Sequence, residues 1–203
     1  MKHIFIFRKN CTLPSEGAVN EEDIGVDITK ENMKEFASHG VWALFARNSN
    51  KPWECMQVGK SCNIGEEIYS DVECLSGEND VMEADVVETV EYINQFGKKV
   101  KINDKECKYN VYLTPRQQTY KQIGAEYEDF VFVCICCGEK YKDDKSAIEK
   151  YAAWKLQALF WRNGGRFKTE KDNVEEPKDI DKIEGSIKKE IDGLVEQYNN
   201  QRN

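Results

Sequence analysis

The sequence lacks any apolar run close to the roughly 18 residues that a membrane-spanning helix needs. Its apolar start, Ile4-Phe5-Ile6-Phe7, is followed at once by Arg8-Lys9. This start is far shorter than the roughly 7–15-residue core of a signal peptide. We therefore expect a cytoplasmic protein that makes no membrane contact.

A second Cys-x-x-Cys motif is also missing, although the chain contains 8 cysteines. Without an export signal, these cysteines are expected to be reduced thiols. Cys134, Cys136 and Cys137 lie together in FVFVCICCG, where Cys134 and Cys137 form the Cys-x-x-Cys. Residues three apart on a strand point to opposite faces. We therefore expect a buried strand rich in small apolar thiols, and no zinc site.

An overall positive charge is lacking as well. The net charge is −8, which argues against a general nucleic-acid binder. The charge is unevenly spread, because residues 98–168 hold 15 Lys and Arg against 9 Asp and Glu, whereas both flanks are acidic. The basic middle is compatible with a phosphate-backbone partner. A solvated, lysine-rich face is the commoner meaning of such a segment.

Several segments have the residue pattern of strands. KHIFIF is rich in β-formers, and FVFVCICC reads as a buried strand. VWALFA and WECMQVG are joined by the turn-forming RNSNKP, which predicts a hairpin. A second hairpin is expected in KKVKINDKECKYNVYL around Asn103-Asp104.

Other segments have helical signals. Thr29 can cap a helix over KENMKEFASHG that ends at Gly40, and NIGEEIYSDVECL begins as a loop or a short helix. DVVETVEYINQF places Val86, Val90 and Ile93 on one helical face. A further helix is predicted in TPRQQTYKQIG. A long apolar helix is predicted from Ser146 to a stop before Asn163-Gly164-Gly165.

The order of elements predicts an α+β fold with a small, mainly antiparallel sheet flanked by helices and a C-terminal helical tail. We expect a domain over residues 1–168, with an inserted segment around 66–113. Residues 169–203 are expected to form an acidic linker and an amphipathic helix. The apolar residues of this 180–198 helix recur at helical spacing, so it packs on the core, on a protein partner or on a second copy in a homodimer. They are Ile180, Ile183, Ile187, Ile191 and Leu194.

The hairpin HGVWALFA…WECMQVGKSCNI resembles the opening of the GIY-YIG nuclease superfamily. In that family Gly-Ile-Tyr starts one strand, and Tyr-Ile-Gly ends the next before a helix that bears an arginine. Gly40-Val41-Trp42 and Gln57-Val58-Gly59 are the counterparts here. FVFVCICCG, Glu149 and Asn163 then follow the family order of strand, catalytic glutamate and asparagine. The chain departs from the family at both signature tyrosines, and it has Glu66 and Glu67 where the arginine is expected.

The resemblance implies a DNA endonuclease, restriction-like in kind, that hydrolyses a phosphodiester with one Mg2+ or Mn2+. It makes Glu149 the metal ligand, and it places Trp42 and Gln57 at the catalytic tyrosine positions. If residues 66–113 are inserted, Arg116 and Tyr120 can take the places of the arginine and a tyrosine. Contacts to phosphate or nucleic acid are then expected from Lys60, Lys155 and Asn163.

Each of these residues also has a plainer interpretation. Ser146-x-x-Glu149 is a capping box, which alone explains a glutamate there. Arg116 can be simply exposed, Tyr120 half-buried and Trp42 part of the core. Loss of the tyrosines also leaves open a catalytically inactive module of this fold that binds nucleic acid, a nucleotide-like ligand or a protein partner.

Overall fold

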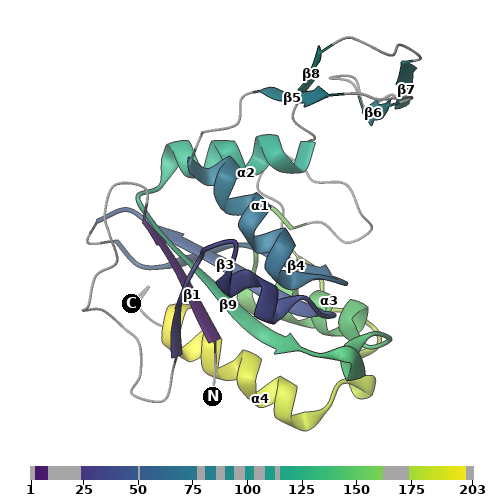
Figure 1. The fold of residues 1–203 in the computed structure, drawn as a ribbon. Coiled ribbons are helices and arrows are strands. Elements are labelled where there is room, and N and C mark those ends of the chain that lie inside the picture. Colours follow the sequence, from purple (N-terminus) through teal and green to yellow (C-terminus); the bar gives the residue numbers. More distant parts are fainter. Residues whose placement is uncertain are drawn as a thin grey trace.

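A five-stranded sheet forms the centre of the computed structural model, which describes residues 3–8, 24–49, 51–76, 81–85, 90–93, 99–102, 108–112, 115–161 and 174–199. Its strand order is β2-β1-β9-β3-β4 (Figure 1). Only β1 and β2 pair in parallel, and the other pairs are antiparallel. The predicted α+β fold with a mainly antiparallel sheet is confirmed. The strands are β1 (His3–Arg8), β2 (Ile24–Asp27), β3 (Gly40–Arg47), β4 (Glu54–Ser61) and β9 (Asp129–Cys137).

The predicted hairpin and the predicted buried strand lie side by side in this sheet. β3 pairs with β4 so that Trp42 lies opposite Gly59, and on its other edge β3 pairs with β9. Most residues of these strands are buried. The sheet therefore needs a layer of helices on each face.

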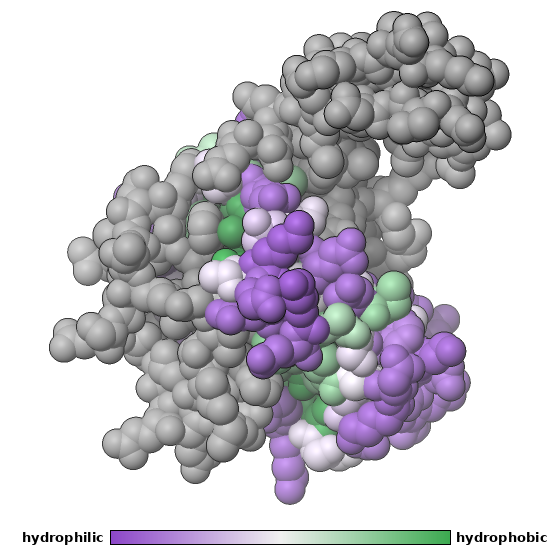
Figure 2. All heavy atoms as spheres, in the orientation of Figure 1, coloured by the Kyte–Doolittle hydropathy of each residue, from purple (hydrophilic) through white to green (hydrophobic). Residues whose placement is uncertain are grey.

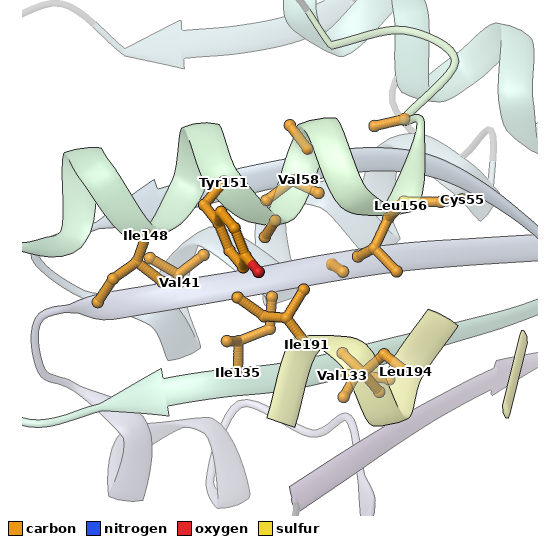
Figure 3. Close-up of a cluster of buried hydrophobic side chains, with 14 of the residues drawn as sticks. Val41, Cys55, Val58, Val133, Ile135, Ile148, Tyr151, Leu156, Ile191 and Leu194 are labelled. Atoms are coloured by element: carbon orange, nitrogen blue, oxygen red, sulfur yellow. The ribbon is translucent and has the colours of Figure 1, made fainter. Parts of the chain in front are cut away.

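One face is covered by a short 3₁₀ helix, η1 (Asn32–Phe36), together with α1 (Ile64–Ser76) and α2 (Pro115–Glu126). The other face is covered by α3 (Lys145–Leu156) and α4 (Gly185–Leu194). Figure 1 shows α1 and α2 on the side of the sheet opposite α4. In Figure 3, Tyr151 of α3 and Ile191 of α4 point into the same apolar layer against Ile135 of β9. Smaller turns are η2 (Glu139–Tyr141), η3 (Ile180–Lys182) and a π-helical turn over Val195–Asn199.

The amphipathic C-terminal segment packs on the core of its own chain. Ile187, Ile191 and Leu194 of α4 are all buried. Beyond α4, the ring of Tyr198 stacks on Phe45 with 4.2 Å between the ring centroids. Of the three arrangements that its pattern allows, the structure has packing on the core, so these apolar residues of α4 are buried within the chain.

The surface that Figure 2 shows is mainly hydrophilic over the described residues, with apolar residues visible only in small areas. Within the described part of the chain, no helix combines the length and the apolar character needed to cross a membrane.

The helices next to the hairpin differ from their predicted extent. The hydroxyl of Thr29 accepts a hydrogen bond from the Asn32 backbone N–H at 3.1 Å, but the helix that follows is only a 3₁₀ turn. Gly40 begins β3 and does not end a helix. A Cβ at Gly40 would lie 2.0 Å from the Cys136 carbonyl oxygen. The glycine is thus required by a close approach between strands.

The segment between α1 and α2 forms two small sheets. β5 (Val81–Asp85) pairs with β8 (Lys108–Tyr112), and β6 (Val90–Ile93) pairs with β7 (Lys99–Ile102). The predicted helix through Val90 and Ile93 is therefore wrong in its described part, and so is the pairing of β7 with β8. The spacing of these residues suits a helix, but β-branched residues also favour strands, and pairing with partner strands decides between the two. Asn103 and Asp104 lie outside the described residues.

Candidate functional site

The candidate site lies where the end of β4 meets the first turns of α3. The Nζ of Lys60 is 2.8 Å from the Oε2 of Glu149. The glutamate side chain is 15% exposed and the lysine side chain 36%. Lys60, predicted to contact phosphate, and Glu149, predicted to hold a metal, thus form a single, partly buried ion pair.

Glu149 does not cap its helix. α3 begins after Asp144, so Ser146 lies inside the helix, and the N-cap position makes no side-chain hydrogen bond. The predicted capping box is therefore wrong, because the helix starts earlier than the sequence pattern indicates. The carboxylate of Glu149 is free to point across to the strand end.

Trp161, which lies within the long apolar helix predicted from the sequence, completes this site. The indole N–H of Trp161 donates a hydrogen bond to the Glu149 carboxylate. Trp161 reaches it because α3 ends at Leu156, with Gln157 in the left-handed region at φ 49°. The chain then turns back along β4, where the Phe160 N–H donates to the Met56 carbonyl at 2.9 Å. The predicted continuation of the helix to residue 162 is wrong, and no glycine marks its actual end.

Gln57 positions this returning segment. Its Nε2 donates to the Phe160 carbonyl at 3.3 Å, and its Oε1 accepts from the Val58 N–H at 3.1 Å. The side chain is 1% exposed. Gln57 thus holds residue 160 against β4, which keeps Trp161 over Glu149. This contact is structural support at the position where the resemblance places a catalytic tyrosine.

The electrostatics of Glu149 reflect its enclosure. Burial is the largest influence and raises the pKa of its carboxyl group. The hydrogen bonds from Lys60 and Trp161 and the positive charge of Lys60 lower this pKa. The nearby negative charge of Glu67 on α1 raises the pKa further, and the net direction is upward. The carboxylate of Glu149 is therefore influenced by one positive side chain, Lys60, and by one negative side chain, Glu67.

Replacing Lys60 by methionine should destabilise the protein more at high pH than at low pH. The folded-state pKa of Glu149 is already raised, and it rises further without Lys60. The folded state then loses stability as the pH climbs from the unfolded value of 4.5 through the folded one. We expect a loss of about 1–3 kcal/mol in the free energy of unfolding at pH 8 and a smaller loss at pH 5, measured by urea unfolding.

Lys34→Met is the matched control for Lys60→Met. Lys34 pairs with Glu31 at 2.8 Å, but the two side chains are 65% and 83% exposed. Its removal should cost less than about 0.5 kcal/mol at either pH. An equal loss at pH 5 and pH 8 in Lys60→Met would show that the pair is not electrostatically coupled to folding.

Trp42 and Tyr120 lie in the core between the sheet and the α1–α2 layer. Both side chains are 0% exposed, and their ring centroids are 6.4 Å apart. Trp42 also packs edge-on against Phe132. The structure brings these two candidates together, but away from solvent and without a described contact to Glu149.

Gly59 is matched to Trp42, because a Cβ at position 59 would lie 2.3 Å from the indole ring. Gly59→Ala should therefore overpack the core and cost about 1–3 kcal/mol. In the double variant Gly59→Ala/Trp42→Phe, the loss in free energy of unfolding should be smaller than the sum of the losses in the two single variants. Gly185→Ala is the control, since its Cβ meets nothing within 4 Å. Additive losses in thermal unfolding would contradict this contact.

The remaining predicted residues are not gathered at Glu149. Lys155 forms an ion pair with Asp192 of α4 at 3.2 Å, and it lies over the Trp154 ring at 5.3 Å. Arg116 is in the first turn of α2, but its side chain is outside the described part. Asn163 also lies outside the described residues.

The lysines near the start of α3 are interleaved with acidic residues. Lys140 and Lys142 are exposed, and so are Glu139, Asp143 and Asp144. This stretch therefore does not build a strongly positive surface. Within the described residues, Lys60 is the basic side chain that pairs with Glu149.

Within the described residues, no group of three His, Cys, Asp or Glu side chains is placed to hold a metal ion. A Mg2+ site on one or two carboxylates that shares substrate phosphate oxygens does not need such a group. Glu149 and Glu67 fit that type of donor set, because their mutual repulsion would be relieved by a cation.

In comparisons with protein families, with curated proteins and with solved structures, the chain finds no match.

Proposed function

We propose that this protein is a divalent-metal-dependent DNA endonuclease of GIY-YIG type and restriction-like kind. The observation that carries the proposal is the position of Glu149: its carboxylate is not used as a helix cap and meets Lys60 at the end of the second hairpin strand. A glutamate held there by Lys60 and Trp161 corresponds to the metal ligand that the resemblance implies. A cytoplasmic location is part of the same proposal.

The order of the elements supports this proposal. The hairpin β3–β4 is followed by α1, and later by β9 and then α3, which bears the glutamate. This is the order of hairpin, helix, hydrophobic strand and glutamate-bearing helix that the sequence resemblance implies. β3 lies between β4 and β9, so both ends of the resemblance meet in one sheet.

Mg2+ or Mn2+, when bound, would polarise the phosphate and stabilise the leaving oxygen. Glu149 would hold the ion, with Glu67 as a second carboxylate. Lys60, released from the glutamate, would contact a phosphate oxygen. Trp161 would keep the carboxylate oriented through its indole N–H. Arg116, in α2, is proposed to neutralise charge on the transition state.

A second candidate is a catalytically inactive module of the same fold that binds nucleic acid, a nucleotide-like ligand or a protein partner. The burial of Trp42, Gln57 and Tyr120, each at most 1% exposed, favours it. These are the side chains assigned to the attacking side of the reaction, and in this conformation they do not reach a substrate.

Plasmid cleavage separates the two candidates. The wild type should cut DNA with Mg2+ or Mn2+ and not with a chelator, and Arg116→Ala should cut more slowly. Filter binding across salt concentrations should show DNA affinity that falls as salt rises, which both nucleic-acid candidates share. Binding without cleavage on several substrates and with both metals would support the inactive module. If the protein neither binds nor cleaves DNA, the endonuclease proposal is refuted.

A further inference from the structure

The end of β9 contains a β-bulge that changes which way its cysteines point. Up to Cys134, side chains alternate between the two faces of the sheet, but Ile135 and Cys136 both pack on the α3–α4 face. The pairing shifts at the same place, because Cys136 lies opposite Val41 whereas Cys134 lies opposite Trp42. Cys134 and Cys137 thus share the α1–α2 face. The expectation that they point to opposite faces is wrong, since an extra residue is inserted between them.

Each of the two thiols changes the pKa of the other. The thiol of Cys134 donates a hydrogen bond to the sulfur of Cys137, which lowers the pKa of Cys137 to about 7 against the effect of burial. The same interaction, together with burial, raises the pKa of Cys134 well above its ordinary value. Cys137 is only partly buried, whereas Cys134 is 7% exposed. One sulfur is therefore an accessible nucleophile and the other a protonated neighbour.

The bulge also sets the backbone separation of the pair. Their partners on β3 are Gly40 and Trp42, which are two residues apart. The Cα atoms of Cys134 and Cys137 are three residues apart in the chain, but because of the bulge they are separated by only about two residues' rise of a strand, roughly 6.6–6.8 Å. Disulfides join Cα atoms about 4.4–6.8 Å apart. A bond between Cys134 and Cys137 is therefore within reach, but near the long limit, where strain makes it easy to reduce.

We propose that Cys134 and Cys137 form a reversible thiol–disulfide site that reacts with hydroperoxides. The Cys137 thiolate attacks one oxygen of the peroxide, so that an S–O bond forms and the O–O bond breaks. The other oxygen leaves, takes up a proton and departs as an alcohol or water. The sulfur is oxidised to a sulfenic acid and the peroxide is reduced.

Cys134 completes the reaction as the resolving thiol. Its sulfur attacks the sulfur of the Cys137 sulfenic acid, so that an S–S bond forms and the S–O bond breaks. Hydroxide leaves with the proton of the thiol as water. A cellular dithiol or glutathione returns both cysteines to thiols by exchange.

Hydrogen peroxide is the probe for this site, used on the full-length protein with Cys136→Ser so that tryptic peptide 122–140 holds only the two cysteines. Free thiols are then blocked by alkylation. Mass spectrometry should show that both cysteines of this peptide escape alkylation and that the peptide is two hydrogen atoms lighter than its dithiol form. Dithiothreitol should reverse the change. With Cys134→Ser, a dimedone adduct of the sulfenic acid should accumulate on Cys137. With Cys137→Ser, neither product should form.

The rate of alkylation tests whether Cys137 is a reactive thiol, because a purely structural cysteine would not be alkylated unusually fast. At pH 7 we expect iodoacetamide to label Cys137 at least about a hundredfold faster than Cys136, because burial raises the pKa of Cys136 to about 12. Cys134→Ser keeps a hydrogen-bond donor and should preserve the fast rate, whereas Cys134→Ala should slow it. Slower labelling of Cys137 than of the exposed Cys62, or no intrachain bond after peroxide treatment, would overturn the proposal.

Discussion

Glu149→Gln is expected to lower metal-dependent DNA cleavage about a thousandfold while the protein stays folded. The glutamine keeps the shape of the side chain and can still accept the hydrogen bond from Trp161, but it has no negative charge with which to hold a divalent ion. A loss of about 4 kcal/mol in transition-state stabilisation corresponds to this factor. The measurement is the initial rate of plasmid cleavage under single-turnover conditions with Mg2+ and with Mn2+.

The free energy of unfolding should change by less than about 1 kcal/mol in Glu149→Gln. Burial already disfavours the charged form of this group, as the raised pKa of Glu149 indicates. Lys60 is exposed enough to turn toward water once its partner is neutral. This distinguishes a lost ligand from a lost fold.

Glu139→Gln is the matched control, since it makes the same chemical change ten residues earlier on a side chain that is 78% exposed. It should cleave at the wild-type rate. If Glu149→Gln also cleaves at that rate, Glu149 is not the metal ligand, and the endonuclease proposal loses the observation on which it rests.

Ile191→Asp should have the largest effect on stability. Ile191 is 0% exposed in the layer between α4 and the sheet, next to Ile135 and Tyr151 (Figure 3). The variant loses a buried aliphatic side chain and places an unpaired carboxylate in the core. We expect a loss of about 5 kcal/mol or more in urea unfolding, which approaches the whole stability of many domains.

Lys189→Asp introduces the same side chain on the exposed face of the same helix. It should change the free energy of unfolding by less than about 0.5 kcal/mol. If Ile191→Asp were equally mild, α4 would be a loosely docked appendage, and the predicted role of this helix in partner binding would have to be considered again.

The hairpin and the buried strand could be predicted because short apolar runs bounded by turn residues carry their own signal. Residues 41–46 and 130–136 have no competing helical interpretation. The strand β6 could not be predicted, since Val90 and Ile93 also suit a helix and only pairing with β7 decides. α1 was understated because Glu66, Glu67 and Asp71 interrupt its apolar pattern, although Asp71 is buried in the structure.

The sequence predicts some residues of the candidate site, but it does not predict the contacts between them. The sequence predicts roles for both Lys60 and Glu149, but their contact depends on the crossing of α3 over β4, which neither local sequence indicates. The role of Trp161 has no sequence signal, because the apolar run predicts an uninterrupted helix whereas α3 ends before Gln157. The bulge at Ile135 is likewise produced by pairing with β3, so the shared face of Cys134 and Cys137 had no sequence signal.

The place of β3 between β4 and β9 determines the order in which the sheet can be assembled during synthesis. The β3–β4 hairpin can form as soon as residue 61 has emerged from the ribosome. The opposite edge of β3 then stays unpaired until β9 emerges, because Arg47 pairs with Asp129, which lies 82 residues later in the chain. An apolar strand with a bare edge is a template for pairing between nascent chains. Chaperone dependence and aggregation should therefore be greatest for chains that end before residue 129.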